Sequence, residues 1–398
     1  MRGREAALAA LLLLLNGCAP TSPAQASPSP QPSIQIANFE RYSGAYRTAA
    51  NSVYVVNGHG HLLNLQDSSF RQFYPTATPD RFTIGHSFAI PSPVEAEVSF
   101  HMAGSRADQL TIKPPTGSPV AAGRLLFKET EVQIPTTGGA VLAGTVTEPL
   151  TPGPHPGIVI VHGSGPGPRI DYGVWVGLYA SLGLTVMAYD KRGNGSSTGK
   201  YPGEYPSDAA LEIYATDAAA TLRFLSSWPA VNPNRVGFHG GSQAGWVVPL
   251  AIARHQAPAA FVVLVSCPAV TVDQQGVWAS FSNGSTTLPS ASPEAMDAEV
   301  RATTSSGYVP ATVLATIRQP MLWANGAADR QVPTTVNAEI LRSLHHPNWD
   351  IEILPGVDHG LFENSSGLEG DDAKATKLAS GLRDLIATWL ARTISVSP

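Results

Sequence analysis

The sequence of 398 residues predicts a doubly wound α/β domain with a mostly parallel sheet, preceded by a small all-β barrel or sandwich. Two observations support this prediction. Residues 34–126 contain short alternating or β-branched runs separated by turn clusters, a pattern typical of antiparallel strands. After Phe127, continuous apolar runs of strand length alternate with helical stretches, which indicates a parallel sheet with helices on both faces.

The first 33 residues predict export. Arg2 and Arg4 precede an apolar run of about ten residues, which is too short to span a bilayer but fits the core of a secretory signal. The run leads into Leu-Asn-Gly-Cys, ending at Cys18, which resembles a bacterial lipobox; an ordinary signal peptide with a chance cysteine is the alternative. We therefore expect a signal peptide over 1–17, a lipid on Cys18 and a Pro/Ser-rich tether over 18–33. The protein is then expected to be a membrane-anchored lipoprotein on the periplasmic or extracellular side.

Composition excludes several classes of protein. Lys and Arg total 25 against 30 Asp and Glu, so the formal net charge of −5 provides no basic field, and we expect no nucleic-acid partner. Only two cysteines occur, Cys18 and Cys267, which excludes a disulfide scaffold. Because Cys267 follows an apolar strand-like run, we expect it to be a buried structural thiol rather than a catalytic one.

The β-rich module, residues 34–126, is expected to contain several short strands. Those with the strongest pattern are Ser52–Val56, His61–Leu65, Phe82–Ile84 and Ala96–Met102. The module also holds His59, His61, His86 and His101. A His-x-His pair on a strand can chelate zinc, but no carboxylate or cysteine stands nearby at ligand spacing. We therefore expect turn and surface histidines and no metal site.

The second domain, residues 127–398, is expected to alternate strand and helix. Its predicted strands are Ile158–Val161, Leu184–Ala188, Arg235–Phe238, Phe261–Val265 and Met321–Trp323. Its predicted helices are Tyr172–Leu182, Asp208–Ser227, Ala244–His255, Thr334–Leu344 and Ala373–Leu390. The strandless segment 271–317 has the length of a small lid, with a plain surface excursion as the alternative. In this class of sheet, chemistry is expected at the carboxyl ends of the strands.

The segment 237–246 joins a strand to a helix and places Ser242 in the turn between them. A nucleophilic serine in such a turn needs small residues two positions before and after it, because the strand and helix backbones crowd the corner. Gly240 and Ala244 meet this need, although Ala244 replaces the usual glycine and Gly245 follows one place later. A glycine-rich helix entry with a capping serine would give the same pattern.

Three further loops follow predicted strands. The loop 162–167 is rich in glycine, and its backbone N–H groups can face an oxyanion together with the N–H of Gln243. It lacks the Lys-Ser or Lys-Thr pair of a phosphate-binding loop. Asp329 stands just past a strand, and His359 stands between the last strand and the last helix. The chain order Ser242, Asp329, His359 is that of α/β-hydrolases and differs from the trypsin and subtilisin orders.

On these motifs, residues from about 127 to 395 resemble an α/β-hydrolase of the dienelactone hydrolase and prolyl-oligopeptidase-like branch. Residues 162–166 read HGSGP and are similar to the oxyanion loop of bacterial serine esterases. Segment 189–199 is similar to the D-x-R-G-x-G-x-S loop of the superfamily. Segments of the β-rich module, such as Phe39–Tyr46, resemble a lipocalin-like accessory domain appended to some serine hydrolases.

The resemblance implies a role for each site residue. Ser242 would be the nucleophile, His359 the general base and Asp329 the acid that orients it. The backbone N–H groups of Ser164 and Gln243 would form the oxyanion hole.

Some neighbouring residues leave alternatives open. Related esterases tend to carry Asp-Arg-Asp after the oxyanion loop, whereas segment 168–171 reads Pro-Arg-Ile-Asp, which leaves the role of Arg169 open. Asp358 is a rival for the acid, but side chains of adjacent loop residues usually diverge. Asp190 and His162 are expected to brace their loops rather than to take part in catalysis.

The expected function is hydrolysis of a small-molecule carboxylic ester through a Ser-His-Asp triad and an acyl-enzyme, with no metal or organic cofactor. One alternative is a peptidase, because the same branch includes oligopeptidases; these usually carry a β-propeller far larger than the module seen here. Another is a non-catalytic surface-binding lipoprotein on a hydrolase scaffold. The intact set of Ser242, Asp329 and His359 argues against this last alternative.

The lipid on Cys18 can be tested by substitution. Cys18→Ser should move the protein from the membrane to the soluble fraction, because the serine side chain cannot form the thioether that carries the lipid. Cell fractionation followed by immunoblotting measures the distribution. Unchanged membrane association of the variant would contradict the assignment.

Overall fold

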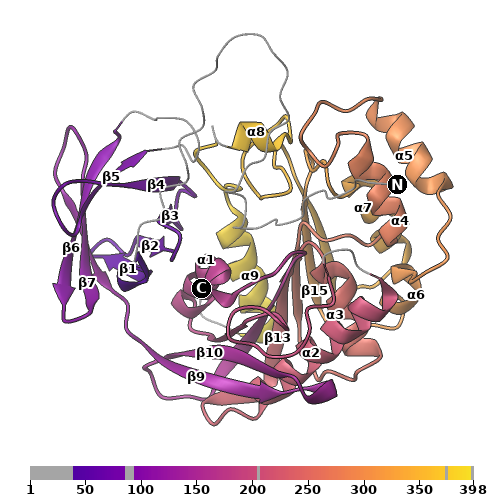
Figure 1. The fold of residues 1–398 in the computed structure, drawn as a ribbon, viewed down its shortest axis with the longest axis horizontal. Helices are drawn as coiled ribbons and strands as arrows, with labels where there is room; N and C mark the ends of the chain where they lie inside the picture. The colour runs from indigo at the N-terminus through magenta and orange to yellow at the C-terminus, as the bar shows by residue number, and fades with distance from the viewer. Residues whose placement is uncertain (1–38, 86–93, 204–206, 373–374, 396–398) are drawn as a thin grey trace.

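The computed structural model describes residues 39–85, 94–203, 207–372 and 375–395. The predicted signal peptide, Cys18, the tether and His86 lie outside these residues. Figure 1 shows a barrel formed by the N-terminal strands beside a larger domain built on a central sheet. Among the described residues, no helix combines the length and the apolar character that crossing a membrane requires.

The N-terminal body is a closed barrel of eight antiparallel strands, in which β1 pairs with β8. The strands are β1 (Gly44–Thr48), β2 (Val53–Val56), β3 (His61–Asn64), β4 (Phe70–Pro75), β5 (Arg81–Gly85), β6 (Ala96–Ala103), β7 (Arg106–Lys113) and β8 (Val120–Arg124). A short 3₁₀ helix, η1 (Phe39–Arg41), precedes them. Of the two predicted alternatives, barrel and sandwich, the chain adopts the barrel.

Aromatic side chains fill the barrel. Phe39, Tyr42, Phe73, Phe82 and Phe100 are buried together, with ring centroids between 4.5 and 5.9 Å apart in the contacting pairs. Rings at these separations pack edge to face or tilted, which adds stability to the burial of their area. The interior is therefore a packed core, as expected of a barrel with few strands.

The second body is an eight-stranded sheet in the order β16-β15-β14-β13-β11-β12-β10-β9. Its strands are β9 (Phe127–Pro135), β10 (Val141–Pro149), β11 (His155–Val161), β12 (Thr185–Tyr189), β13 (Val231–Gly241), β14 (Val262–Val265), β15 (Met321–Gly326) and β16 (Trp349–Leu354). Only the pairs β9·β10 and β10·β12 are antiparallel. The predicted class, a mostly parallel doubly wound sheet after a small all-β domain, is confirmed.

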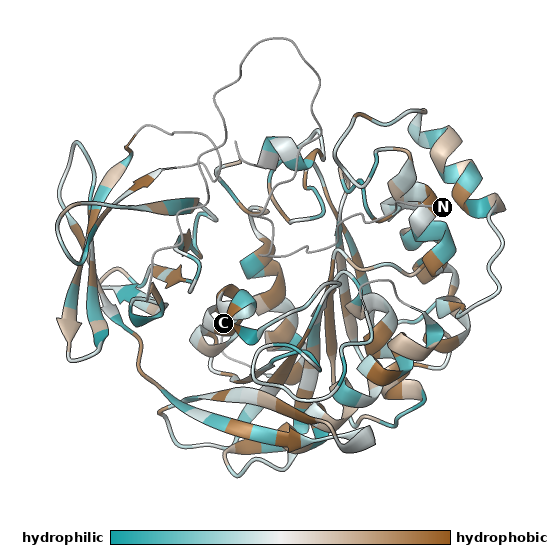
Figure 2. Cartoon of the chain, in the orientation of Figure 1, coloured by the Kyte–Doolittle hydropathy of each residue, from teal (hydrophilic) through white to brown (hydrophobic). Residues whose placement is uncertain are grey.

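Helices cover both faces of the sheet because its strands are apolar on both sides. One face carries α1 (Gly173–Ser181) and α9 (Leu382–Ile394), and the other carries α2 (Asp208–Ser226), α3 (Ala244–Ala253), α6 (Pro310–Leu314) and α7 (Thr334–Ser343). Along β11, Ile158 and Ile160 join the core under α1, whereas Val159 and Val161 join the core under α2 and α3. Figure 2 shows hydrophobic residues concentrated on these central strands.

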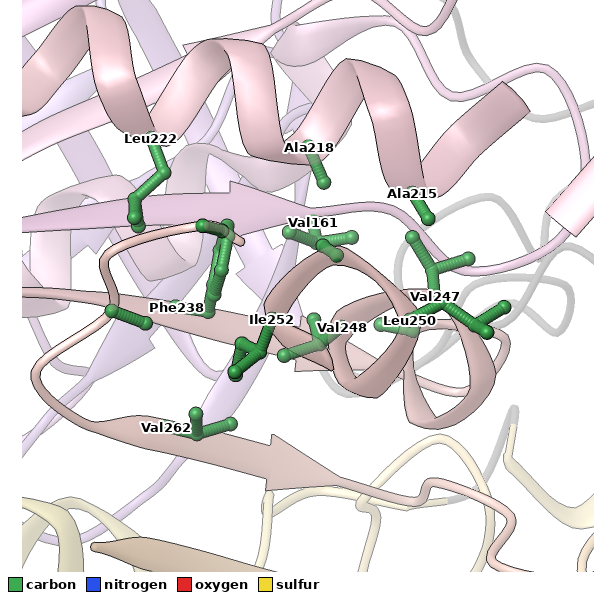
Figure 3. Packing of buried hydrophobic residues seen from close by; sticks show 14 of the residues in the cluster. Val161, Ala215, Ala218, Leu222, Phe238, Val247, Val248, Leu250, Ile252 and Val262 are labelled. Carbon is green, nitrogen blue, oxygen red and sulfur yellow. The ribbon is translucent and has the colours of Figure 1, made fainter. Parts of the chain in front are cut away.

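The core under α3 fixes the position of the turn at Ser242. Figure 3 shows side chains of α3 packed among those of α2 and the strands, and the labelled residues are Val161, Ala215, Ala218, Leu222, Phe238, Val247, Val248, Leu250, Ile252 and Val262. Helix α3 is buried almost along its whole length. A helix held on all sides gives the preceding turn a rigid base.

The last helix differs from the prediction. Instead of spanning Ala373–Leu390, α9 begins at Leu382, after Gly381 with a φ of +80°. The residues before it form an extended strip that bonds to the barrel, because Phe70 N–H donates to Thr376 O at 2.8 Å and Leu378 N–H donates to Ser68 O at 2.9 Å. These tertiary hydrogen bonds replace the helical ones that the local sequence favours.

The barrel also packs against α1. Val55, Leu63 and Phe70 on its outer surface share a core cluster with Trp175 and Leu178. At the closest point, a Cβ added to Gly177 would lie 2.8 Å from a methyl carbon of Val55. The barrel can sit this close to the helix only because that position is glycine.

The segment between β14 and β15 contains α4 (Val272–Ser280), α5 (Pro293–Ala302) and α6. Its first two helices form a small core of their own with α7, made of Val270, Trp278, Met296, Val300 and Val336. A lid role for 271–317 stays a prediction.

A buried ion pair joins the loop after β12 to α2. Arg192 Nε donates to Asp217 Oδ2 at 2.8 Å, and Nη2 of the same guanidinium donates to Oδ1. Thr136 Oγ1 also donates to Asp217 Oδ1, at 2.8 Å. The exposed fractions of the two ionic side chains are 9% and 3%, so neither charge is solvated well enough to stand alone.

We expect Arg192→Met to lower the free energy of unfolding by about 3–5 kcal/mol, because it leaves the Asp217 carboxylate buried without its cation. Arg106→Met is the matched control, since it breaks the exposed pair with Glu129 and should cost less than about 1 kcal/mol. Urea denaturation followed by circular dichroism measures both values. Equal losses in the two variants would contradict this account.

Candidate active site

Ser242 lies in the sharp turn between β13 and α3. Its φ is +50°, which is uncommon for a residue with a side chain and indicates a strained turn. A Cβ added to Gly240 would lie 2.4 Å from Ala244 Cβ, so the corner accepts the alanine at 244 only because 240 is glycine. The predicted turn therefore forms with alanine in place of the usual last glycine.

Gly245 lets α3 lie close to the segment that follows β14. A Cβ at this position would lie 2.6 Å from Pro268 O and 2.9 Å from Cys267 Cβ. Cys267 itself is fully buried, and burial raises the pKa of its thiol well above the ordinary value. A neutral thiol in a packed core is what the structural interpretation of Cys267 requires.

Asp329 lies in the loop between β15 and α7, and its carboxylate is held at both oxygens. Oδ1 accepts hydrogen bonds from the backbone N–H groups of Gln331 at 2.7 Å and Val332 at 2.8 Å. Oδ2 lies 2.8 Å from Nδ1 of His359. The two backbone donors fix the direction of the carboxylate and leave its second oxygen for the imidazole.

His359 lies in the loop after β16 and joins the other two residues. Its Nε2 is 3.2 Å from Ser242 Oγ while its Nδ1 faces Asp329, so the structure brings all three predicted triad residues into one hydrogen-bonded chain. All three are buried. With Nδ1 donating to the carboxylate, Nε2 is left as the acceptor for the serine proton.

Asp358, the rival acid, is hydrogen-bonded within its own loop. Its Oδ1 accepts from Phe362 N–H and its Oδ2 accepts from Asn364 Nδ2, both at 2.9 Å. These bonds close the loop that carries His359. The structure therefore gives Asp358 a bracing position and places Asp329 beside the imidazole.

The loop 162–167 contributes free backbone donors. Within the described residues, the N–H groups of Ser164 and Gln243 make no hydrogen bond to the protein, as an oxyanion hole would require. Gly163 N–H instead donates to Tyr172 Oη at 3.3 Å, at the end of η3 (Arg169–Tyr172). The oxyanion assignment of Ser164 and Gln243 stays a prediction that this arrangement allows.

His162 braces the loop from behind. Its Nε2 donates to Tyr189 O at 2.6 Å, and its ring lies edge-on to Tyr172 and Tyr189. Burial, reinforced by the charge of Lys191, lowers the pKa of His162 to about 3. A ring this hard to protonate is neutral at neutral pH.

Arg169 and Asp190 hold each other. Arg169 donates to Asp190 through its backbone N–H at 2.8 Å and its guanidinium at 3.1 Å, and a second guanidinium nitrogen lies 2.5 Å from Glu131 Oε2. Asp190 also accepts from Ser196 N–H at 2.8 Å. With two carboxylates already bound, Arg169 is a loop-bracing residue.

Each described histidine of the barrel has a hydrogen-bond partner, and His61 is buried on β3, so the expectation of a turn or surface residue is wrong for it. His59 Nε2 lies 2.8 Å from Asp171 Oδ1, His61 Nδ1 lies 3.0 Å from Asn57 Nδ2, and the exposed His101 pairs with Asp108. Within the described ranges, no group of three or more His, Cys, Asp and Glu side chains is placed to hold a metal ion.

One residue at the site was missed by the sequence reasoning. Lys191 follows β12, is only 3% exposed, and donates to two carbonyl groups of loop 162–167 and to the side chain of Gln243. Its position between Asp190 and Arg192, inside a glycine-rich loop motif, was visible in the sequence. Nothing in that motif indicates that this lysine is buried.

The sequence of this chain is similar to a known protein family and to a mycobacterial protein. The model of the prolyl oligopeptidase family matches residues 174–376, just over half of the chain. An uncharacterized protein of Mycobacterium tuberculosis is 26% identical over 259 residues, which cover 64% of this chain and 81% of that protein.

Solved structures with similar architecture include an esterase, Pf2001, of Pyrococcus furiosus and dipeptidyl peptidase 4 of Porphyromonas gingivalis. The esterase is 17% identical with a TM-score of 0.47, covering 67% of this chain and 93% of its own. The peptidase is also 17% identical with a TM-score of 0.47, covering 86% of this chain and 46% of its own. The family match over half of the chain decides the assignment: this protein belongs to the prolyl oligopeptidase family of serine hydrolases, which have the α/β-hydrolase fold.

Proposed function

We propose that this protein is a serine esterase that hydrolyses carboxylic esters of small molecules. The observation that carries the proposal is the hydrogen-bonded chain from Ser242 Oγ through His359 to Asp329, at the carboxyl ends of β13, β15 and β16. The same chain of groups activates serine on unrelated folds, because the chemistry depends on their geometry.

In the proposed mechanism, His359 Nε2 takes the proton of Ser242 as Oγ attacks the ester carbonyl carbon. Asp329 stabilises the imidazolium through Nδ1–H, and the N–H groups of Ser164 and Gln243 bind the tetrahedral oxyanion. His359 then gives the proton to the leaving alcohol oxygen, which leaves an acyl-enzyme. Water then attacks the acyl carbon and passes one proton to His359, which returns it to Ser242 Oγ as the carboxylic acid is released.

Two features favour esters over peptides. The barrel core is filled by aromatic side chains, so the accessory domain does not have the open channel that would select peptides. The described barrel strands span only 44–124, which is small for a domain that admits and screens a peptide chain. The family assignment keeps peptide hydrolysis as the second candidate.

We also propose that the chain is exported and held at the membrane through Cys18, because a lipobox-like sequence precedes this residue.

Turnover of p-nitrophenyl acetate, compared with that of a peptide anilide, tests the proposed function. We expect ester hydrolysis that Ser242→Ala abolishes, together with fluorophosphonate labelling at Ser242 that the variant loses. Preferential anilide cleavage would favour the peptidase. No turnover and no labelling would favour a binding protein, and labelling that persists in Ser242→Ala would contradict the assignment of the nucleophile.

The choice between the two candidate acids, Asp329 and Asp358, is tested with a matched pair of variants. Asp329→Asn should lower kcat by about 10⁴-fold, because an amide fixes the wrong tautomer of His359. Asp358→Asn should lower kcat far less, because this carboxylate accepts hydrogen bonds from Phe362 N–H and Asn364 Nδ2 in its own loop rather than from His359. Steady-state kinetics on p-nitrophenyl acetate measures both. A larger loss in Asp358→Asn would overturn the assignment of Asp329.

A further inference from the structure

A buried ammonium group lies directly behind the predicted oxyanion loop. Lys191 Nζ donates to Gly163 O at 2.8 Å, to Gly165 O at 3.1 Å and to Gln243 Oε1 at 2.9 Å. The first two acceptors belong to the loop that carries Ser164, and the third belongs to the residue after the nucleophile. One cation therefore joins the two segments that would supply the oxyanion hole.

The bond to Gly163 O acts on a specific peptide unit. That carbonyl and the N–H of Ser164 belong to the same amide, and in a trans peptide they point in opposite directions. An ammonium on the carbonyl side therefore turns the N–H of Ser164 away from Lys191. It also draws electron density toward the oxygen, which makes the N–H a stronger donor.

The remaining contacts hold the lysine in this place. The Tyr214 ring centroid lies 4.3 Å from Nζ and the Tyr201 centroid 5.9 Å, both within range of a cation–π interaction. His162 lines the same small cavity as Lys191 and Gln243, and its neutral ring adds no competing positive charge. The surroundings thus suit a fixed positive charge.

We propose that Lys191 is a positioning residue for the oxyanion hole, which orients and polarises the N–H of Ser164 and fixes Gln243 beside it. This inference deepens the proposed function and rests on it. The positive charge stands behind the site where the carbonyl oxygen of the substrate becomes negative, in surroundings shielded from water, where such a charge acts strongly. Its effect is therefore largest in the transition state, and kcat should respond more than KM.

Two uncharged substitutions separate this role from simple bracing. Lys191→Met removes the charge and the donors, while Lys191→Gln removes the charge and shortens the side chain but keeps an amide head with two N–H donors. Lys113→Met is the control, because Lys113 is an exposed barrel lysine that pairs with Glu97. Thermal unfolding identifies the folded variants before any kinetic comparison.

The readouts are kcat and KM for p-nitrophenyl acetate and the inhibition constant of an alkyl trifluoromethyl ketone, which forms an oxyanion when serine adds to it. We expect kcat to fall about 100-fold in folded Lys191→Met, the size of losing one oxyanion-hole donor, with KM little changed. The inhibition constant should rise by a similar factor. Lys191→Gln should show the same pattern to a smaller extent, and Lys113→Met should match the wild type.

Two results would overturn the proposal. One is wild-type kcat and inhibitor affinity in a folded Lys191 variant, and the other is a change confined to KM or to the melting temperature. Failure of the proposed function gives a different result, in which the wild type itself shows no ester turnover that Ser242→Ala abolishes. The two failures are therefore distinguishable in the same set of measurements.

Discussion

The site depends on the contact between two loops at the carboxyl end of the sheet, one after β15 and one after β16. A Cβ added to Gly326, the last residue of β15, would lie only 2.1 Å from Val357 O, and Ala328 N–H donates to the same carbonyl at 2.9 Å. This approach sets the 2.8 Å separation between Asp329 and His359. Parallel neighbouring strands make the approach possible, since their ends meet at one edge.

The sequence predicted the parts of the fold that follow simple rules. Buried parallel strands read as continuous apolar runs, so five of the sheet strands and the helices between them were visible. Strands β9 and β10 were not predicted. β9, at one edge of the sheet, is exposed at most positions, so it carries no continuous apolar run. The strip before α9 was predicted as helix because its partner, the segment at the start of β4, is about three hundred residues away in the chain.

The candidate site shows the same division. Ser242, Asp329 and His359 were predicted because each follows a strand and their chain order is diagnostic, and the structure joins them by hydrogen bonds. Lys191 was not predicted, because burial of a lysine depends on three acceptors from two other segments of the chain. A residue whose role comes from distant partners leaves little trace in its own local sequence.

The strip 375–378 makes the barrel more than an attached module. It bonds to Ser68 and Phe70 on one side and to the segment after His359 on the other, where Phe362 bridges to Leu378 and its ring lies 5.4 Å from that of Phe70. Opening of the barrel at the start of β4 would therefore uncover the strip beside the loop that holds the imidazole. These contacts tie the local stability of the loop around His359 to that of the barrel.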